Sequence, residues 1–175
     1  AITAPADDFA STLSFPSVST PRGLPREWVE RFGRPVYEYV AYLQRLNLRR
    51  IKVEQIIEPH LRTKGFVKNT LPPKSMWRNI RKTLLVADRL ARHLNEPVDE
   101  VVSAYRSPAY NARCAGARRN SYHMHNMALD LKFRTSPRTV ARLARALREH
   151  GLFQGGVGSY SGFTHIDTRG KKADW

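Results

Sequence analysis

The chain has 175 residues, enough for one domain with a real hydrophobic core, and 41% of them are hydrophobic, as in a globular protein. Thirty Lys and Arg residues against fifteen Asp and Glu residues give a formal net charge of +15, which predicts attraction to an anionic polymer. No apolar run reaches the roughly 18 residues of a membrane-spanning helix. The single cysteine, Cys114, excludes an intrachain disulfide.

Nucleic acid is the first anionic partner that such a charge brings to mind. The sequence has no zinc-finger spacing, no ribonucleoprotein-type aromatic motif and no recognition-helix signature, so the charge alone does not indicate DNA or RNA binding. Cell-wall polymers and lipid surfaces are anionic too, and Arg side chains are often simply solvated. We therefore expect no nucleic-acid partner. A basic nucleic-acid-binding protein with incidental histidines stays as an alternative.

The first part of the chain predicts an irregular N-terminal arm over residues 1–30, followed by a single domain over 31–175. Four prolines interrupt any helix in the arm: Pro5, Pro16, Pro21 and Pro25. Apolar residues then recur at helical spacing after Pro35, which predicts a helix over residues 36–46. A shorter apolar group follows at 53–57.

Two stronger helices are predicted in the rest of the chain. Ser75 is expected to cap the first, whose apolar stripe runs over residues 77–94. The second is expected to begin with Ser136 as its cap and Pro137 in its first turn, and to end at Gly151.

Strands are predicted at 101–105, 128–133, 156–158 and 163–168. In the second of these, Leu129, Leu131 and Phe133 alternate with the other residues, so Asp130 points away from the apolar face. In the fourth, His165 and Asp167 fall together on one face. The predicted fold class is therefore α+β, with helices packed on a small, mostly antiparallel sheet.

Three residues in and beside these strands have the chemistry of a zinc site: His123, Asp130 and His165. They supply two imidazoles and one carboxylate, three protein ligands with room for water, as in a catalytic rather than a structural zinc site. Two alternatives remain open. His125 competes with His123 as a ligand, and Cys114 could be a fourth ligand, although a small buried thiol is the commoner state of a free cysteine.

These residues also carry a family resemblance. The chain resembles the zinc D-Ala-D-Ala carboxypeptidases and VanX-type peptidoglycan peptidases, whose hallmark is S-x-H-x-x-G-x-A-x-D. Residues 103–111 resemble the family's "GYRS…YN" element, and residues 155–169 resemble the "GGVGxY…HxDTR" ending of its murein endopeptidase branch. The resemblance covers a motif-bearing core over about residues 75–175. Four positions match the hallmark: Ser121, His123, Ala128 and Asp130.

This resemblance implies a Hedgehog/DD-peptidase-like fold, a Zn²⁺ cofactor and hydrolysis of amide bonds in the peptide stems or cross-links of peptidoglycan, by a carboxypeptidase or an endopeptidase. It implies peptidoglycan as the partner, with other anionic cell-wall polymers beside it, and we expect a monomer. We also expect a periplasmic protein or one otherwise exported to the cell wall. The chain begins with Ala1 and shows no export signal.

The resemblance assigns roles to three further residues. Arg106 resembles the family's Arg that faces the substrate carbonyl or carboxylate, where a fixed positive fork would stabilise negative charge. A structural salt bridge is its alternative role. Ser121 is expected to hydrogen-bond the substrate, and Tyr160 to line the pocket.

Two departures from the family pattern matter. Asn126 stands where the family usually has Gly, although Asn tolerates left-handed backbone better than most residues. Many relatives carry an acid or a His as general base shortly before the last zinc His, where this chain has Gly162 and Phe163. Asp167 is the nearest candidate for the base, and the alternative is that it only orients His165. A zinc-containing cell-wall binding module with impaired catalysis is therefore a second hypothesis.

Overall fold

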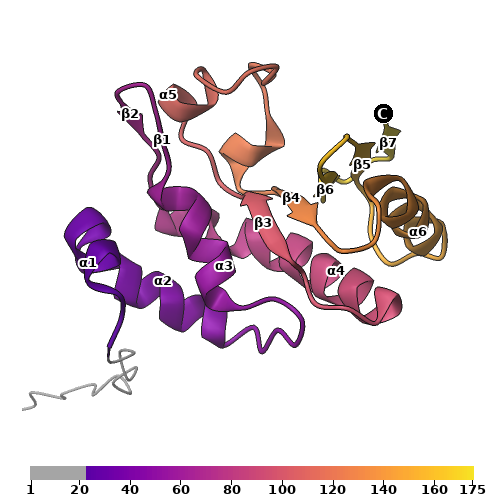
Figure 1. Cartoon of the computed structure of the whole chain (residues 1–175), viewed down its shortest axis with the longest axis horizontal. Helices are drawn as coiled ribbons and strands as arrows, with labels where there is room; N and C mark the ends of the chain where they lie inside the picture. Colours follow the sequence, from indigo (N-terminus) through magenta and orange to yellow (C-terminus); the bar gives the residue numbers. More distant parts are fainter. Residues whose placement is uncertain (1–22) are drawn as a thin grey trace, which may run out of the picture.

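The computed structural model describes residues 23–175 (Figure 1). The α-helices are α1 (Arg26–Phe32), α2 (Pro35–Gln44), α3 (Val53–Ile57), α4 (Trp77–Leu94), α5 (Pro108–Asn111) and α6 (Pro137–Glu149), and the 3₁₀ turns are η1 (Glu58–Leu61), η2 (Lys74–Met76) and η3 (Tyr122–His125). The strands are β1 (Thr63–Lys64), β2 (Val67–Lys68), β3 (Glu100–Ser103), β4 (Ala128–Lys132), β5 (Gly156–Ser159), β6 (Thr164–Asp167) and β7 (Ala173–Asp174). Figure 1 shows α1, α2 and α3 at one end of the molecule and α6 with β5–β7 at the other.

The main sheet has five strands in the order β3-β4-β6-β5-β7, and β1 pairs with β2 separately. Neighbouring strands of the main sheet are antiparallel except for β5 and β7, which are parallel. The expected α+β class with a small, mostly antiparallel sheet is confirmed. The sequence did not predict β1, β2 and β7, because two residues are too few to show an alternating pattern.

The register of β4 and β6 separates a polar face of the sheet from an apolar face. Asp130 lies directly opposite His165, and Leu129 lies opposite Ile166. Because side chains alternate along a strand, Asp130 and His165 share one face and Leu129 and Ile166 share the other. Both α4 and α6 contact β6. Asp130 and His165 therefore stand on a sheet whose opposite face is packed against helices.

The core joins this apolar face to the helices. Helix α4 contributes side chains at intervals of three and four residues, and α6 does the same, as expected for amphipathic helices. Each fully buried aliphatic side chain stabilises the fold by about 1.5–3 kcal/mol relative to an exposed one. The buried residues of the two helices and the sheet include Ile80, Leu84, Ala87, Ala91, Val140, Ala144, Leu129, Leu131, Val157 and Ile166.

One predicted helix cap is wrong and one is confirmed. Ser75 does not cap α4, because it lies inside η2, and the residue before the helix is Met76, which makes no side-chain cap. The chain enters α4 through this tight turn, in which the Met76 amide donates to the Pro73 carbonyl at 2.8 Å. Ser136 does cap α6, since its hydroxyl accepts a hydrogen bond from the Thr139 amide at 3.4 Å.

The irregular arm expected over residues 1–30 needs a correction at its end. Residues 1–22 lie outside the part of the chain that the structure describes, but α1 begins at Arg26. Trp28 is buried in the core cluster, so tertiary packing stabilises a helix that the prolines before it obscured. The single domain over 31–175 stays a prediction. From residue 23 onward, no helix has the length and apolar character needed to cross a membrane.

Candidate metal centre

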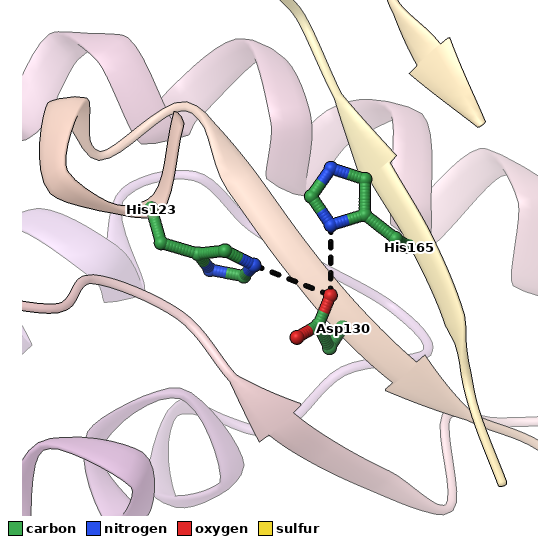
Figure 2. Close-up of side chains that lie close together, drawn as sticks. All are labelled: His123, Asp130 and His165. Carbon is green, nitrogen blue, oxygen red and sulfur yellow. Dashed lines mark hydrogen bonds and ion pairs between the residues drawn. The ribbon is translucent and has the colours of Figure 1, made fainter. Parts of the chain in front are cut away.

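Three elements bring His123, Asp130 and His165 together on the polar face of the sheet (Figure 2). His123 comes from η3, Asp130 from the middle of β4, and His165 from β6. All three side chains are buried, and one ligand atom from each lies within 4.8 Å of the others. Residues from two distant motifs therefore form one compact cluster of possible metal ligands.

The tight turn of η3 directs His123 back over β4. Ser121 precedes the turn, and its hydroxyl accepts a hydrogen bond from the His123 amide at 3.3 Å. Asn126 ends the turn in the left-handed conformation, with φ 54° and ψ 40°. Glycine, which the resemblance leads one to expect here, adopts this conformation without strain, and Asn adopts it more readily than most other residues. Asn126 therefore suits the backbone conformation that ends this turn.

The tautomer of His123 is set by a backbone carbonyl. Its Nδ1 atom lies 2.7 Å from the carbonyl oxygen of Ala104. A carbonyl only accepts hydrogen bonds, so Nδ1 carries the proton and donates it. The lone pair of neutral His123 is then on Nε2, which lies 3.2 Å from Oδ1 of Asp130.

The tautomer of His165 is set in the same way by a carboxylate. Its Nε2 atom lies 2.9 Å from Oδ2 of Asp167. Burial alone would raise the pKa of Asp167, but its hydrogen bonds to Arg169, His165 and the Gly156 amide outweigh this and hold the pKa below its usual value. Ionised Asp167 can only accept, so Nε2 of His165 donates and its Nδ1 faces Oδ1 of Asp130 at 2.8 Å.

Two nitrogen lone pairs and a carboxylate oxygen thus converge with no proton donor among them when both imidazoles are neutral. These electron-rich atoms repel one another, and a cation placed between them would relieve the repulsion. Two imidazoles and one carboxylate are ligands that suit zinc, and three protein ligands leave a position for water or substrate. The donor set therefore fits the predicted cofactor.

The two alternative ligands lie apart from this cluster. His125 is exposed at the end of η3, and its carbonyl accepts a hydrogen bond from the side chain of Asn79. Cys114 is half-buried, and its thiol lies 3.4 Å from the carbonyl oxygen of Tyr110. Neither residue belongs to the cluster of ligand atoms.

Burial and mutual contacts set the protonation of the cluster. Burial alone would raise the pKa of Asp130, but the charges and hydrogen bonds of His123 and His165 outweigh it and hold that pKa well below its usual value. Burial lowers the pKa of His123. Burial acts in the same direction on His165, but hydrogen bonds and charge from Asp130 and Asp167 raise its pKa above the usual value. Asp130 is therefore a carboxylate at neutral pH.

Arg106 holds the outer oxygen of Asp130. Its Nη2 atom donates to Oδ2 of Asp130 at 3.0 Å, and its Nε atom donates to the hydroxyl of Ser103 at 2.8 Å. This contact is the salt bridge considered as the alternative role of Arg106, and it leaves Oδ1 of Asp130 facing the imidazoles. Arg106 also lines the cavity beside the cluster, so its expected contact with substrate stays a prediction.

Asp167 is fully buried, and its two oxygens are occupied by the chain itself. Oδ1 accepts from the Gly156 amide at 2.9 Å and from Nε of Arg169 at 2.8 Å, while Oδ2 accepts from His165 and from Nη2 of Arg169. Asp167 does not line the cavity. Of its two predicted roles, this geometry favours the orientation of His165.

A cavity of about 230 Å³ opens beside the cluster. The three expected substrate contacts, Arg106, Ser121 and Tyr160, all line it together with the three candidate ligands. Tyr160 lies at the rim and stacks on Phe163 with ring centroids 4.6 Å apart. A larger cavity of about 700 Å³, next to the loop that joins α2 and α3, contains none of these residues.

Sequence reasoning missed part of the cavity wall. Trp175 lies against His165 with ring centroids 5.1 Å apart, and Arg118 and Tyr122 are among the other residues that line the cavity. The sequence offers only indirect evidence for the position of Trp175. The two glycines of β5 occupy alternate positions, so one face of that strand has no side chains there and can be covered by another group.

Comparison with known proteins gives one match. A family model described as Peptidase M15 matches residues 49–167, and no curated protein or solved structure matches the chain. The match includes His123, Asp130 and His165, and it begins upstream of residue 75, where the resemblance in the sequence began. It covers more than half of the 175 residues, so the chain belongs to the peptidase M15 family.

Proposed function

We propose that this protein is a zinc-dependent peptidase that hydrolyses amide bonds in the peptide stems or cross-links of peptidoglycan. Membership of the peptidase M15 family makes it a metallopeptidase, while zinc as the metal and peptidoglycan as the substrate are our proposal. The observation that carries it is the convergence of His123 Nε2, His165 Nδ1 and Asp130 Oδ1 beside an open cavity.

The chemistry divides between the cofactor and the chain. Zinc held by His123, Asp130 and His165 would acidify a bound water and polarise the scissile carbonyl. Arg106, fixed by its contacts with Asp130 and Ser103, would hold positive charge close to the carbonyl oxygen as negative charge develops there.

Ser121 and Tyr160 support the substrate part of the proposal. Their hydroxyl groups line the cavity and can donate or accept hydrogen bonds with a peptide backbone. The net charge of +15 favours association with anionic cell-wall polymers, which supports an exported protein that acts on the wall.

One observation favours a second candidate function. Among the described residues that line the cavity, the only acids and histidines are the three candidate ligands. From residue 23 onward, no acid or histidine besides these three lines the cavity as a general base, as also expected of a zinc-containing cell-wall binding module with impaired catalysis.

Digestion of purified sacculi by the zinc-loaded protein, followed by mass spectrometry of the products, tests both functions. The peptidase hypothesis expects new peptide termini in the stems or cross-links, and His165→Ala as control should produce none. A protein that holds one equivalent of zinc and binds sacculi, but produces no new peptide termini, would favour the binding module instead. The identity of the released fragments distinguishes a carboxypeptidase from an endopeptidase.

A further inference from the structure

The residue after strand β7, Trp175, places an aromatic side chain beside the candidate metal centre. Beyond β7, the Trp175 amide donates to the Val157 carbonyl at 3.3 Å, and the Ser159 amide donates to the Trp175 carbonyl at 2.9 Å. Trp175 therefore continues the parallel pairing with β5. Its indole lies against the ring of His165 and lines the cavity.

Two glycines of β5 leave room for the indole of Trp175. A Cβ atom on Gly158 would lie 2.4 Å from Nε1 of Trp175. One on Gly156 would lie 2.5 Å from Oδ2 of Asp167 and 3.0 Å from the far edge of the indole. Neither glycine has a positive φ, so the backbone itself does not require glycine there. Val157, between them, faces the core. The absence of side chains at 156 and 158 therefore lets the indole lie on the polar face of β5.

An ion pair between a buried arginine and a surface aspartate anchors the strand that leads to Trp175. Arg148 of α6 is only 3% exposed, and its Nη2 atom donates to both carboxylate oxygens of Asp174 at 2.8 and 2.9 Å. Its Nη1 atom also donates to the Gly155 carbonyl at 2.9 Å. Helix α6 thus fixes the backbone immediately before Trp175.

The indole itself is held from two further directions. Its Nε1 atom donates to the hydroxyl of Tyr160 at 2.7 Å, and the guanidinium of Arg169 lies 5.2 Å from its centroid. Trp175 is nevertheless 38% exposed and is not part of the hydrophobic core cluster. An aromatic ring fixed in this way contributes mainly to the shape of the cavity that it lines.

From this geometry we propose that Trp175 is a specificity-determining residue. Its indole is a fixed wall that restricts the substrate residue next to the scissile bond to a small side chain. The cavity of about 230 Å³ is smaller than the roughly 300–1,000 Å³ of common ligand sites, so a bulky side chain meets the indole. This inference rests on the proposed peptidase function and adds the residue that sets its selectivity.

The test uses two peptidoglycan-type peptides that differ only in the residue beside the scissile bond, Ala in one and Leu in the other. The measured quantity is the ratio of kcat/KM for the Leu peptide to that for the Ala peptide. This ratio is independent of the fraction of active enzyme, so partial unfolding does not change it. Trp175→Ala should raise the ratio by about 10-fold or more, the scale of discrimination by pocket size, and Trp175→Phe should raise it less.

A second variant moves the indole without replacing it. Gly158→Ala places a methyl group where the ring lies, so the indole must shift and the ratio should rise as in Trp175→Ala. Gly162→Ala is the matched control, because a Cβ at Gly162 meets nothing within 4 Å. Its ratio should equal that of the wild type.

The outcomes separate the inference from the function on which it rests. A zinc-loaded wild type that cleaves neither peptide and leaves sacculi intact contradicts the proposed peptidase. A wild type that cleaves the Ala peptide, with a ratio unchanged in both Trp175→Ala and Gly158→Ala, overturns the role of Trp175. Equal loss of activity on both peptides would assign Trp175 a structural role and overturn it too.

Discussion

The Oδ2 atom of Asp167 lies 2.9 Å from the Nε2 atom of His165, while the other ring nitrogen of His165 faces Asp130. Asp167 is two residues from His165 on the same strand. The guanidinium of Arg169 donates hydrogen bonds to both carboxylate oxygens of Asp167 and holds this side chain in place. Because the carboxylate accepts a hydrogen bond from Nε2, the Nδ1 lone pair faces Asp130 and the candidate metal position. This arrangement favours a role for Asp167 in orienting His165, a candidate metal ligand.

Replacement of Asp167 by Asn tests this role. An amide cannot accept from His165, Arg169 and the Gly156 amide together, so the orientation of His165 is weakened. We expect zinc affinity to fall by about 10- to 100-fold, with activity restored by added zinc. Zinc competition with a chromogenic chelator, combined with activity at each zinc concentration, measures both. A fall in kcat of about 10²- to 10⁴-fold at saturating zinc would instead identify Asp167 as the general base.

The ligand assignment predicts the metal content of two histidine variants. His165→Ala removes one of three converging donors, and we expect it to lose both bound zinc and peptidase activity. His125→Ala is the matched control, because His125 is exposed and outside the cluster, and it should keep one equivalent of zinc. Elemental analysis of protein purified without chelators measures the content. Full zinc in His165→Ala would contradict the assignment.

Gly155 is expected to be the least replaceable glycine near the site. A Cβ atom there would lie 1.7 Å from the backbone carbonyl oxygen of Asp167, which cannot move without disturbing β6. Gly155→Ala should therefore lower the free energy of unfolding by about 1–3 kcal/mol or more, as overpacking does. Urea unfolding compares it with Gly162→Ala, which should unfold like the wild type. Equal stability of the two variants would show that β6 adjusts freely.

Because His60 is buried, we expect the free energy of unfolding to fall in mild acid. His60 is fully buried, its Nδ1 lies 3.2 Å from the Ile57 carbonyl oxygen, and burial lowers its pKa to about 4. The unfolded chain takes up this proton near pH 6.5, before the folded chain does. The free energy of unfolding should therefore fall as the pH drops from about 6.5 to about 4, by about 3 kcal/mol in total.

Urea unfolding of the zinc-loaded wild type and His60→Leu at pH 7.5 and pH 5 measures this effect. The metal ligands are the same in both proteins, so their titration cancels in the comparison. His60→Leu should lose less stability on acidification than the wild type. Equal losses would show that His60 does not titrate in this range.

The charge of the protein predicts that binding to the cell wall depends on salt. If the net charge of +15 holds an anionic polymer, sacculus binding should weaken steeply as salt is added, because exposed charges more than about 10 Å apart are screened near 0.1 M. Hydrolysis of a small soluble peptide should change much less. Co-sedimentation with sacculi between low and high salt, beside the peptide assay, compares the two. Binding that is indifferent to salt would contradict an electrostatic attachment.

Much of the fold and the ligand set could be predicted from the sequence, because they depend on local patterns. Alternating apolar residues marked β4, and helical spacing marked α4 and α6. The candidate ligands His123 and Asp130 lie within one short motif, and His165 lies in a second. Such patterns follow from the periods of strands and helices, which each segment carries by itself.

The tertiary structure decided the partners of each side chain. The Ala104 carbonyl that sets the tautomer of His123 lies 19 residues away in the chain. The register of β6 between β4 and β5 gives Asp167 its contacts, and β7 was too short to show any period. The place of Trp175 over Gly158 depends on a parallel pairing anchored by α6. These contacts join segments far apart in sequence, and packing and register, which no local pattern encodes, determine them.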